Sequence, residues 1–382
     1  MKKRRIIIAL MATTTMVGLA SCGSKNKKEP VELTDSDGNQ YTVQQSTDKA
    51  DVTKVLNSLY NLDDKKIEKV SFDANNNMVV NCGNKTFNNQ GEYKFMLDYN
   101  GQEYKYYTNK KDDETLSDDL RQAIIECNEA NDKAALNAIS KSQLYLDIDQ
   151  ETKENEDGGL SEIDIEFDII KTNTADNAFY FNVDEIHTES TNKEYKDYSN
   201  KINSYDKFNG SKFYASPEEL FTTLETNKLS ISNTNSNQVT INNIFMIVQS
   251  KLVPTLNVKT ICANNTISSL IDDYNISIGN AYNNEIRFNI HLSKEQIKDE
   301  FGINITSPGD DYQVNVGINA TLAYVSSISF DFNDIKGYDS SNEALNFDTM
   351  NSSINISYNE DVVIPKKSGE YKSLNELLFS LI

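Results

Sequence analysis

The amino-acid sequence predicts an α+β fold in which a curved antiparallel sheet, shaped as a half-barrel, packs on helices and a small α+β lobe precedes it. Three observations lead to this prediction. Several segments after residue 143 alternate apolar and polar residues. Segments with the apolar spacing of helices lie before, between and after them. Clean alternation is typical of an antiparallel sheet with one buried face and one wet face.

The small lobe is expected over residues 35–110. It begins with a predicted hairpin at 34–43, because Asp37 and Gly38 suit the positive φ of a tight turn. The same stretch is similar to a calcium loop, but its glycine follows too early and the twelfth position holds no Glu, so an EF-hand is excluded. A helix is expected at about 48–60, with one apolar face made of Val52, Val55, Leu56 and Leu59.

Two further segments complete the expected lobe. Short strands are predicted in "KVSFDANNNMVVN" (69–81) and in "YKFMLDYNGQEYKYY" (93–107), with Asn100 and Gly101 as a turn in the second segment. The charged run "KKDDETLSDD" then indicates a boundary near residue 110.

The body is expected to span residues 111–382. Helical spacing predicts helices at 116–127 and 131–141. After these the apolar period changes from the helical value to two. The predicted strands lie in residues 144–150, 161–171, 177–187, 284–292, 312–322, 326–334 and 352–365.

Three more helices are predicted between and after these strands. Ser216 and Glu219 form a capping box at the start of one, and Ser373 and Glu376 form another near the end of the chain. The segment 242–254 reads as a buried helix that stops near Pro254, although a strand of the same apolar character is an alternative. The last helix is expected to dock on the sheet through Leu374, Leu377, Leu378 and Leu381.

The first residues have the pattern of a secretion signal. Lys2, Lys3, Arg4 and Arg5 precede a short apolar run that ends in Leu19-Ala20-Ser21-Cys22. This ending resembles the lipobox of bacterial lipoproteins. The resemblance implies that residues 1–21 are a signal peptide, that Cys22 is lipidated, and that residues 22–34 form a tether.

A diacylglyceryl group supplies two acyl chains, and two chains anchor a protein stably. The chain is therefore expected to be extracytoplasmic and held at the cell membrane. Lys25, Lys27 and Lys28 would be attracted to anionic headgroups, or they belong to a solvated tether. The formal net charge of −21 repels phosphate backbones, so nucleic acid is excluded as a partner. Cys82, Cys127 and Cys262 are expected to be free thiols or to form one incidental disulfide.

The element order of residues 111–382, together with the "VVIPKK" ending, resembles the LolA-like carriers of the bacterial envelope. The resemblance implies an incomplete β-barrel wrapped around helices, with an apolar cavity that holds acyl chains. The lobe at 35–110 departs from this pattern. A filled core is the alternative, because alternating apolar strands are also ordinary packing. The candidate cavity residues are Ile163, Ile165, Phe167, Phe181, Ile286, Phe288, Ile290, Phe330 and Phe332.

Carboxylates occupy every second position of "SEIDIEFDIIK" (161–171). They can form the solvated face of a strand, a cation patch of the kind that Ca²⁺ accepts, or the carboxylate pair of a glycosidase. Nearby lysines at 193, 196, 201, 207 and 212 would neutralise them equally well. The candidate cation patch consists of Asp147, Asp149, Glu162, Asp164, Glu166 and Asp168.

The sequence predicts no enzyme, no resident metal and no cofactor. The chain has 2 His, which leaves little general-base capacity near neutral pH. Ser-x-x-Lys recurs by chance, and HExxH, GxSxG and P-loop motifs do not occur. Glu185, His187 and Glu189 would share one side of a strand and suit zinc, but they read better as hydrated residues at a strand end.

Tyrosines alternate with Lys and Asn in the expected long hairpin at 189–210 and just after it. Aromatic residues with polar neighbours suit adaptable contacts. The primary expectation is thus a membrane-anchored, non-catalytic lipoprotein that binds an apolar or lipid-like ligand. The alternative is a cell-surface module that binds an envelope protein or a glycan through Tyr195, Tyr198, Tyr205 and Tyr214.

Overall fold

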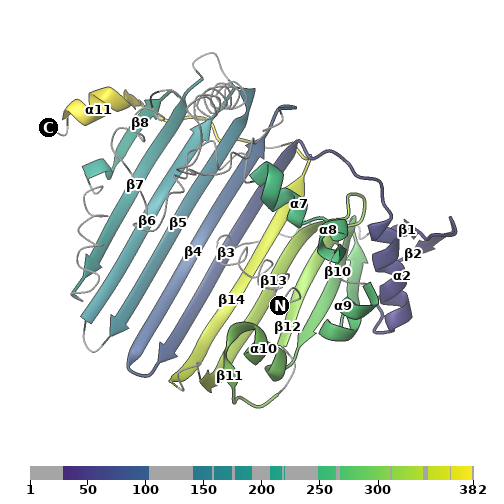
Figure 1. Ribbon diagram of the computed structural model, residues 1–382. Coiled ribbons are helices and arrows are strands. Elements are labelled where there is room, and N and C mark those ends of the chain that lie inside the picture. Colours follow the sequence, from purple (N-terminus) through teal and green to yellow (C-terminus); the bar gives the residue numbers. More distant parts are fainter. Residues whose placement is uncertain are drawn as a thin grey trace, which may run out of the picture.

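The fold is dominated by one large, open and curved sheet (Figure 1). It has 13 strands, and a separate two-stranded sheet joins β1 (Glu32–Thr34) to β2 (Gln40–Thr42). The computed structural model describes residues 29–102, 141–156, 159–173, 177–191, 207–216, 219, 248–263, 267–309, 312–338, 343–361 and 363–380.

Neighbouring strands of the large sheet are antiparallel, as predicted, except that the short β15 runs parallel to β8. Strand β11 (Asn304–Ile305) lies off the main order and pairs with β13. From one edge to the other the order is β15 (Lys372–Ser373), β8 (Ser211–Ala215), β7 (Phe179–Ser190), β6 (Gly159–Lys171), β5 (Gln143–Glu156), β4 (Lys85–Asp98), β3 (Lys69–Cys82), β14 (Ala344–Tyr358), β13 (Tyr324–Tyr338), β12 (Tyr312–Asn319), β10 (Glu285–Leu292) and β9 (Ser277–Tyr282).

The predicted separate lobe at 35–110 is not confirmed, because β3 and β4 are central strands of the large sheet. Each has 14 residues, and a turn at Gly83, with a φ of 61°, connects them directly. The predicted strand at 69–81 is confirmed as β3, and its polar residues "DANNN" pair with β14 over their whole length. The predicted turn at Asn100 and Gly101 is present, with φ values of 48° and 73°. The strand expected after it lies outside the described residues.

The described helices gather mainly over the half of the sheet that runs from β14 to β9 (Figure 1). Helix α2 matches its prediction, and all four predicted apolar residues are buried. Asp48 caps α2 by accepting a hydrogen bond from the backbone N–H of Ala50 at 2.7 Å. The helices are α2 (Lys49–Tyr60), the π-helix η2 (Val248–Leu252), α7 (Val253–Thr255), α8 (Val258–Cys262), α9 (Ile267–Tyr274), α10 (Lys294–Phe301) and α11 (Leu374–Ser380).

Both predicted capping boxes are present. The backbone N–H of Glu219 donates to the Ser216 hydroxyl at 3.1 Å, and the N–H of Ser216 donates to the Glu219 carboxylate at 2.8 Å. The same reciprocal pair joins Ser373 and Glu376. Leu374 and Leu377 are buried as predicted. The side chains of Leu378 and Leu381 lie outside the described residues. The same is true of most of the predicted helices at 116–127, 131–141 and 216–225. For the segment 242–254, the described helical backbone ends at Thr255, next to Pro254, as predicted.

The strand register separates the side chains of the large sheet into an apolar face and a polar face. Residues directly opposite each other in an antiparallel pair share a face. One row of the apolar face crosses seven strands and consists of Phe213, Phe181, Ile169, Leu146, Phe95, Phe72 and Ile356. One row of the polar face crosses nine strands and consists of Glu185, Glu166, Asp149, Glu92, Asn75, Ser353, Ser329, Asn315 and Asn289.

The polar face changes character along such a row. Its members are carboxylates on β7 to β4, and they are carboxamides and hydroxyls from β3 to β10. The apolar face changes in burial instead. Its side chains on β9 to β14 are mostly buried, whereas many on β4 to β7 are only partly buried.

Replacement of Ile354 by Ala tests the packing at the centre of the sheet. Ile354 is 2% exposed and lies opposite Ala74 of β3 and Ile328 of β13. We expect Ile354→Ala to lower the free energy of unfolding by about 2–5 kcal/mol, because the deletion leaves a cavity in a packed core. Urea denaturation measures the change. Val363→Ala is the control, since Val363 is 79% exposed, and a loss below about 1 kcal/mol for Ile354→Ala would contradict this packing.

Candidate functional site

The predicted acidic ladder forms on the polar face where β5 pairs with β6. Asp147 lies opposite Asp168, and Asp149 lies opposite Glu166. The remaining predicted residues of the cation patch, Glu162 and Asp164, share this face. Like charges directly opposite each other destabilise a sheet, so this surface stores electrostatic repulsion.

Strand β7 extends the same surface. Glu185 lies opposite Glu166, His187 opposite Asp164, and Glu189 opposite Glu162. The predicted common side of the Glu185-His187-Glu189 stretch is therefore present. Ile186, between them, packs against the main apolar core.

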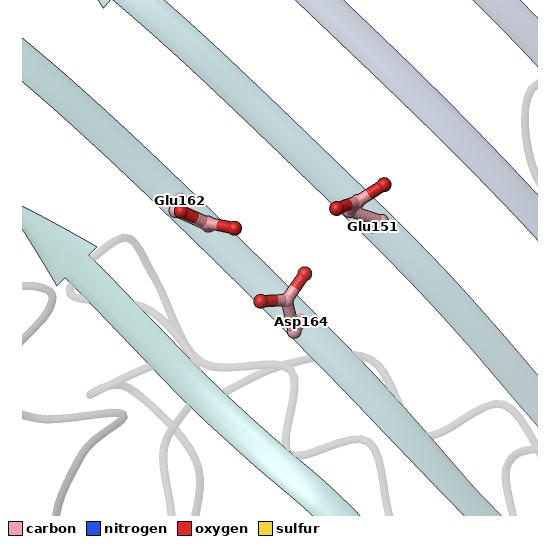
Figure 2. Close-up of side chains that lie close together, drawn as sticks. All are labelled: Glu151, Glu162 and Asp164. Atoms are coloured by element: carbon pink, nitrogen blue, oxygen red, sulfur yellow. The ribbon is translucent and has the colours of Figure 1, made fainter.

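Three carboxylates of this surface come close enough to hold a metal ion. Oxygens of Glu151, Glu162 and Asp164 all lie within 4.8 Å of one another. Figure 2 shows Glu162 and Asp164 on one strand and Glu151 on its neighbour. His187 is not a member of this carboxylate triad.

A lysine of the chain already neutralises part of the triad. The Lys153 ammonium forms an ion pair with Glu151 and lies 2.9 Å from a carboxylate oxygen of Glu162. Hydrogen bonds to Glu151 and then Glu162 raise the pKa of Lys153 above its ordinary value. The lysine thus holds a positive charge where a divalent cation would otherwise balance the carboxylates.

Glu151 and Lys153 were missed because the predicted strand ended at residue 150 and "TKENEDGG" (152–159) was interpreted as a loop. In the structure β5 continues to Glu156, and this polar end pairs with both β4 and β6. The usable signal was the continued alternation of Asp147, Asp149 and Glu151. The pairing partners that make a polar segment a strand are not visible in local sequence.

Three carboxyls of β6, those of Asp164, Glu166 and Asp168, have raised pKa values. Burial is the largest cause for Asp164, Glu166 and Asp168. Repulsion adds to it, from Glu162 for Asp164 and from Asp184 for Glu166. A glycosidase needs two carboxyls whose environments move their pKa values apart. These three move in the same direction, which does not favour that chemistry.

A polar groove of about 360 Å³ adjoins the carboxylate triad through Glu151. Within it the Asn75 amide donates to Glu92 at 3.4 Å. Mixed carboxamide and carboxylate oxygens suit hydrated cations or hydroxyl-rich ligands. The lining residues are Asn75, Asn76, Asn77, Gln90, Gly91, Glu92, Asp149 and Glu151.

An apolar cavity of about 80 Å³ lies on the other face, between the helices and the sheet. Helices α2, α8 and α9 contribute one wall, and β10, β12 and β13 contribute the other. The Cys262 thiol lies in this wall, and burial raises its pKa to about 11. The lining residues are Leu56, Val258, Ile261, Cys262, Leu270, Tyr274, Ile276, Phe288, Ile290, Val316, Ile318 and Val325.

The structure brings only two of the predicted cavity residues, Phe288 and Ile290, to this cavity. Ile286, Phe330 and Phe332 are buried in the filled core around it, where the rings of Phe330 and Phe332 stack at 5.1 Å. The other four, on β6 and β7, lie on the apolar face far along the sheet and are partly buried: Ile163, Ile165, Phe167 and Phe181. The described residues therefore do not form a single cavity lined by all nine predicted residues.

Several predicted residues lie outside the described part of the chain, among them Cys22, Cys127, Tyr195, Tyr198 and Tyr205. Cys262 is a free thiol, and the Sγ of Cys82 donates to a carboxylate oxygen of Glu343 at 3.6 Å. Tyr214 lies on β8 and is 37% exposed, with its ring 5.9 Å from that of Tyr180. Of the predicted neutralising lysines, Lys207 and Lys212 are described, and those at 193, 196 and 201 are not.

No protein-family model matches the chain, and no curated protein is similar to it in sequence. Within the described ranges, no helix is both long and apolar enough to span a bilayer.

The lysine at the triad gives a direct test of cation binding. We expect Lys153→Gln to show Ca²⁺-dependent thermal stabilisation of about 2 °C or more, because the three carboxylates lose their internal counter-charge. Differential scanning fluorimetry with and without millimolar Ca²⁺ measures this shift. Lys366→Gln, at an exposed position away from the triad, is the control. An equal response of both variants would exclude the triad as the binding site.

The raised pKa values make a second prediction. A carboxyl whose folded pKa lies above its unfolded value near 4 destabilises the fold once it ionises, so stability falls as pH rises through the raised pKa. We expect Asp164→Asn with Glu166→Gln to raise the melting temperature by about 1–3 °C at pH 7 and to have no effect below about pH 4. Thermal melts between pH 3 and 8 measure this change, and Glu360→Gln, at an exposed position, is the control. A lower melting temperature of the double variant at pH 7 would contradict the prediction.

Proposed function

We propose that this chain is a membrane-anchored extracytoplasmic lipoprotein whose body binds an apolar or lipid-like ligand without catalysis. The observation that carries the proposal is the apolar cavity of about 80 Å³ between α2, α8, α9 and the sheet. Because the described lining of this cavity is apolar, it is the feature of the described residues that best suits an apolar ligand.

The size of the cavity limits what it accepts. Ligand sites for drug-sized molecules measure about 300–1,000 Å³, and an apolar cavity of about 150 Å³ can hold benzene. A cavity of about 80 Å³ suits a few methylene groups, such as the tip of an alkyl chain. Each buried methylene contributes about 0.8 kcal/mol, so the tip alone gives a weak interaction.

The apolar face beyond the cavity offers further contact. On β4 to β7 its side chains pack against the main core but remain partly accessible, among them Phe95, Phe167, Ile169, Phe181 and Ile186. A longer ligand can therefore contact apolar side chains outside the cavity. This arrangement, an open sheet with helices over one face, agrees with the resemblance to LolA-like carriers.

The leader supports the cellular part of the proposal. Its charged start, short apolar run and Leu19-Ala20-Ser21-Cys22 ending together resemble a lipoprotein signal. Lipidation at Cys22 would hold the body at the membrane, next to the acyl chains that its apolar site would bind.

A cell-surface interaction module remains a second candidate, favoured by one cluster on the polar face. The ring of Tyr180 lies 5.1 Å from that of Tyr371, and the Lys367 ammonium lies 3.6 Å from the centre of the Tyr180 ring. Tyr214 is exposed beside them. Aromatic rings with an adjacent cation and carboxylates suit a protein or glycan surface.

A cavity-filling variant tests the primary proposal. We expect native mass spectrometry of the full chain carrying Cys22→Ala, purified without detergent, to show a co-purified lipid. Val316→Phe in that background is expected to reduce the bound lipid at least about fivefold, because the larger side chain fills the cavity that Val316 lines.

Val363→Phe is the matched control, since Val363 is 79% exposed and its enlargement leaves the cavity unchanged. Thermal melts establish that both variants fold. Absence of lipid from the unsubstituted cavity would contradict the proposal and favour the interaction module.

A further inference from the structure

The first described residues are attached to one corner of the sheet. The backbone N–H of Asn283 donates to the Glu29 carbonyl at 2.9 Å, and the N–H of Glu29 donates to the Asn283 side chain at 3.2 Å. Pro30 forms an antiparallel bridge to Tyr282. The described part of the chain therefore begins beside the β9–β10 turn.

The covalent length of the tether limits which part of the body reaches the membrane. Only 29 − 22 = 7 residue steps separate Cys22 from Glu29, which span at most about 25 Å. Strand β13 alone has 15 residues and measures about 46 Å from Tyr324 to Tyr338. A lipid on Cys22 would thus hold the Tyr324 end of the strands near the bilayer and leave the Tyr338 end beyond the tether's reach.

The corner at the tether consists of two turns that hydrogen-bond to each other. The N–H of Ala320 donates to the Asn284 carbonyl at 2.8 Å, and the Asn284 amide donates to Asn319 at 3.2 Å. Residues 281–284 and 319–324, "AYNN" and "NATLAY", contain no charged residue. This neutral corner comprises these two turns.

Two tyrosines and a leucine of the neutral corner are partly accessible: Tyr282, Tyr324 and Leu322. Tyrosine prefers the membrane–water interface, because its ring is apolar and its hydroxyl is polar. The opposite end of β10 leads into α10, "KEQIKDEF", which is rich in charge and suits water instead.

The charge of the sheet favours the same orientation. The acidic ladder on β5 to β7 lies six to eight strands from β10, about 29–38 Å away. Anionic headgroups repel such a surface. The residues of the neutral corner themselves carry no charge that such headgroups would repel.

We propose that the neutral corner is the membrane-facing surface of this protein and that it contacts a phospholipid bilayer. The inference rests on the proposed lipidation of Cys22. It also explains how a ligand would pass between the bilayer and the cavity. Ile318 and Val325 line the cavity and flank the 319–324 turn, and the N–H of Val258 on α8 donates to Ala323 of that turn at 2.8 Å.

Tryptophan reporters test this orientation, because the chain has 0 Trp. Tyr324→Trp and Tyr338→Trp place one reporter at each end of the same strand. The full lipidated protein is reconstituted in phosphatidylcholine vesicles with and without a headgroup-nitroxide lipid. We expect the nitroxide to reduce the fluorescence of the Tyr324→Trp variant at least twofold and to leave the Tyr338→Trp variant within about a tenth of its value.

Leu322→Trp repeats the measurement if Tyr324→Trp fails to fold, as judged by circular dichroism. Vesicle flotation and the mass of the N-terminal peptide report lipidation separately. A protein without lipid that does not float contradicts the proposed anchor. A lipidated protein that floats but shows equal quenching at both ends, or stronger quenching of Tyr338→Trp, overturns the orientation alone.

Discussion

The pairing of β3 with β14 is the interaction on which the rest of the structure depends. Thirteen register pairs join a strand from the start of the chain to one from its end, from Val70 opposite Tyr358 to Cys82 opposite Leu345. This pairing closes the gap between β4–β8 and β9–β13 and makes them one sheet. Without it the two groups of strands would each have a free edge, which sheets avoid.

The register across this pair, which shifts once between Phe347 and Thr349, also produces the two faces. Because side chains alternate with a period of two, every strand added in register places its apolar residues on the same side. The rows that cross seven and nine strands are the result. On the polar face this arrangement brings like charges close together. Lys153 and Lys94 reduce the resulting repulsion by pairing with carboxylates of β5 and β6.

The positions of the helices and of the tether connect the proposed activities. Helices α2, α8 and α9 cover the apolar face at the same end of the sheet where the chain begins its described path. The apolar cavity, the neutral turns and Glu29, the first described residue, therefore lie together. The acidic surface lies at the other side of the sheet. In a membrane-anchored protein this division would keep the apolar site close to lipid and the carboxylates in water.

Local signals in the sequence determined much of this protein. Period-two alternation predicted strands in β5, β6, β7, β10, β12, β13 and β14, although it missed β8 and β9. Ser216 and Ser373 predicted the capping boxes, and the spacing of Val52 to Leu59 predicted α2. Each of these depends on residues within one or two turns of chain. The sequence alone also supplied the six carboxylates of the candidate patch, because alternation is enough to place them on one face.

The tertiary structure determined which strands are neighbours, and the pairing of strands determined which residues form each candidate site. In the structure β3 and β4 are central strands of the large sheet and not parts of a separate lobe, and Glu151 lies close to Glu162 and Asp164. The tertiary structure also divided the predicted cavity residues between a filled core, a small void and a distant apolar face. The central position of β3 depends on pairing with β14, which lies hundreds of residues away in the sequence, and the triad depends on the pairing of β5 with β6. Periodicity records only which face a side chain takes, and it carries no information about the partner strand.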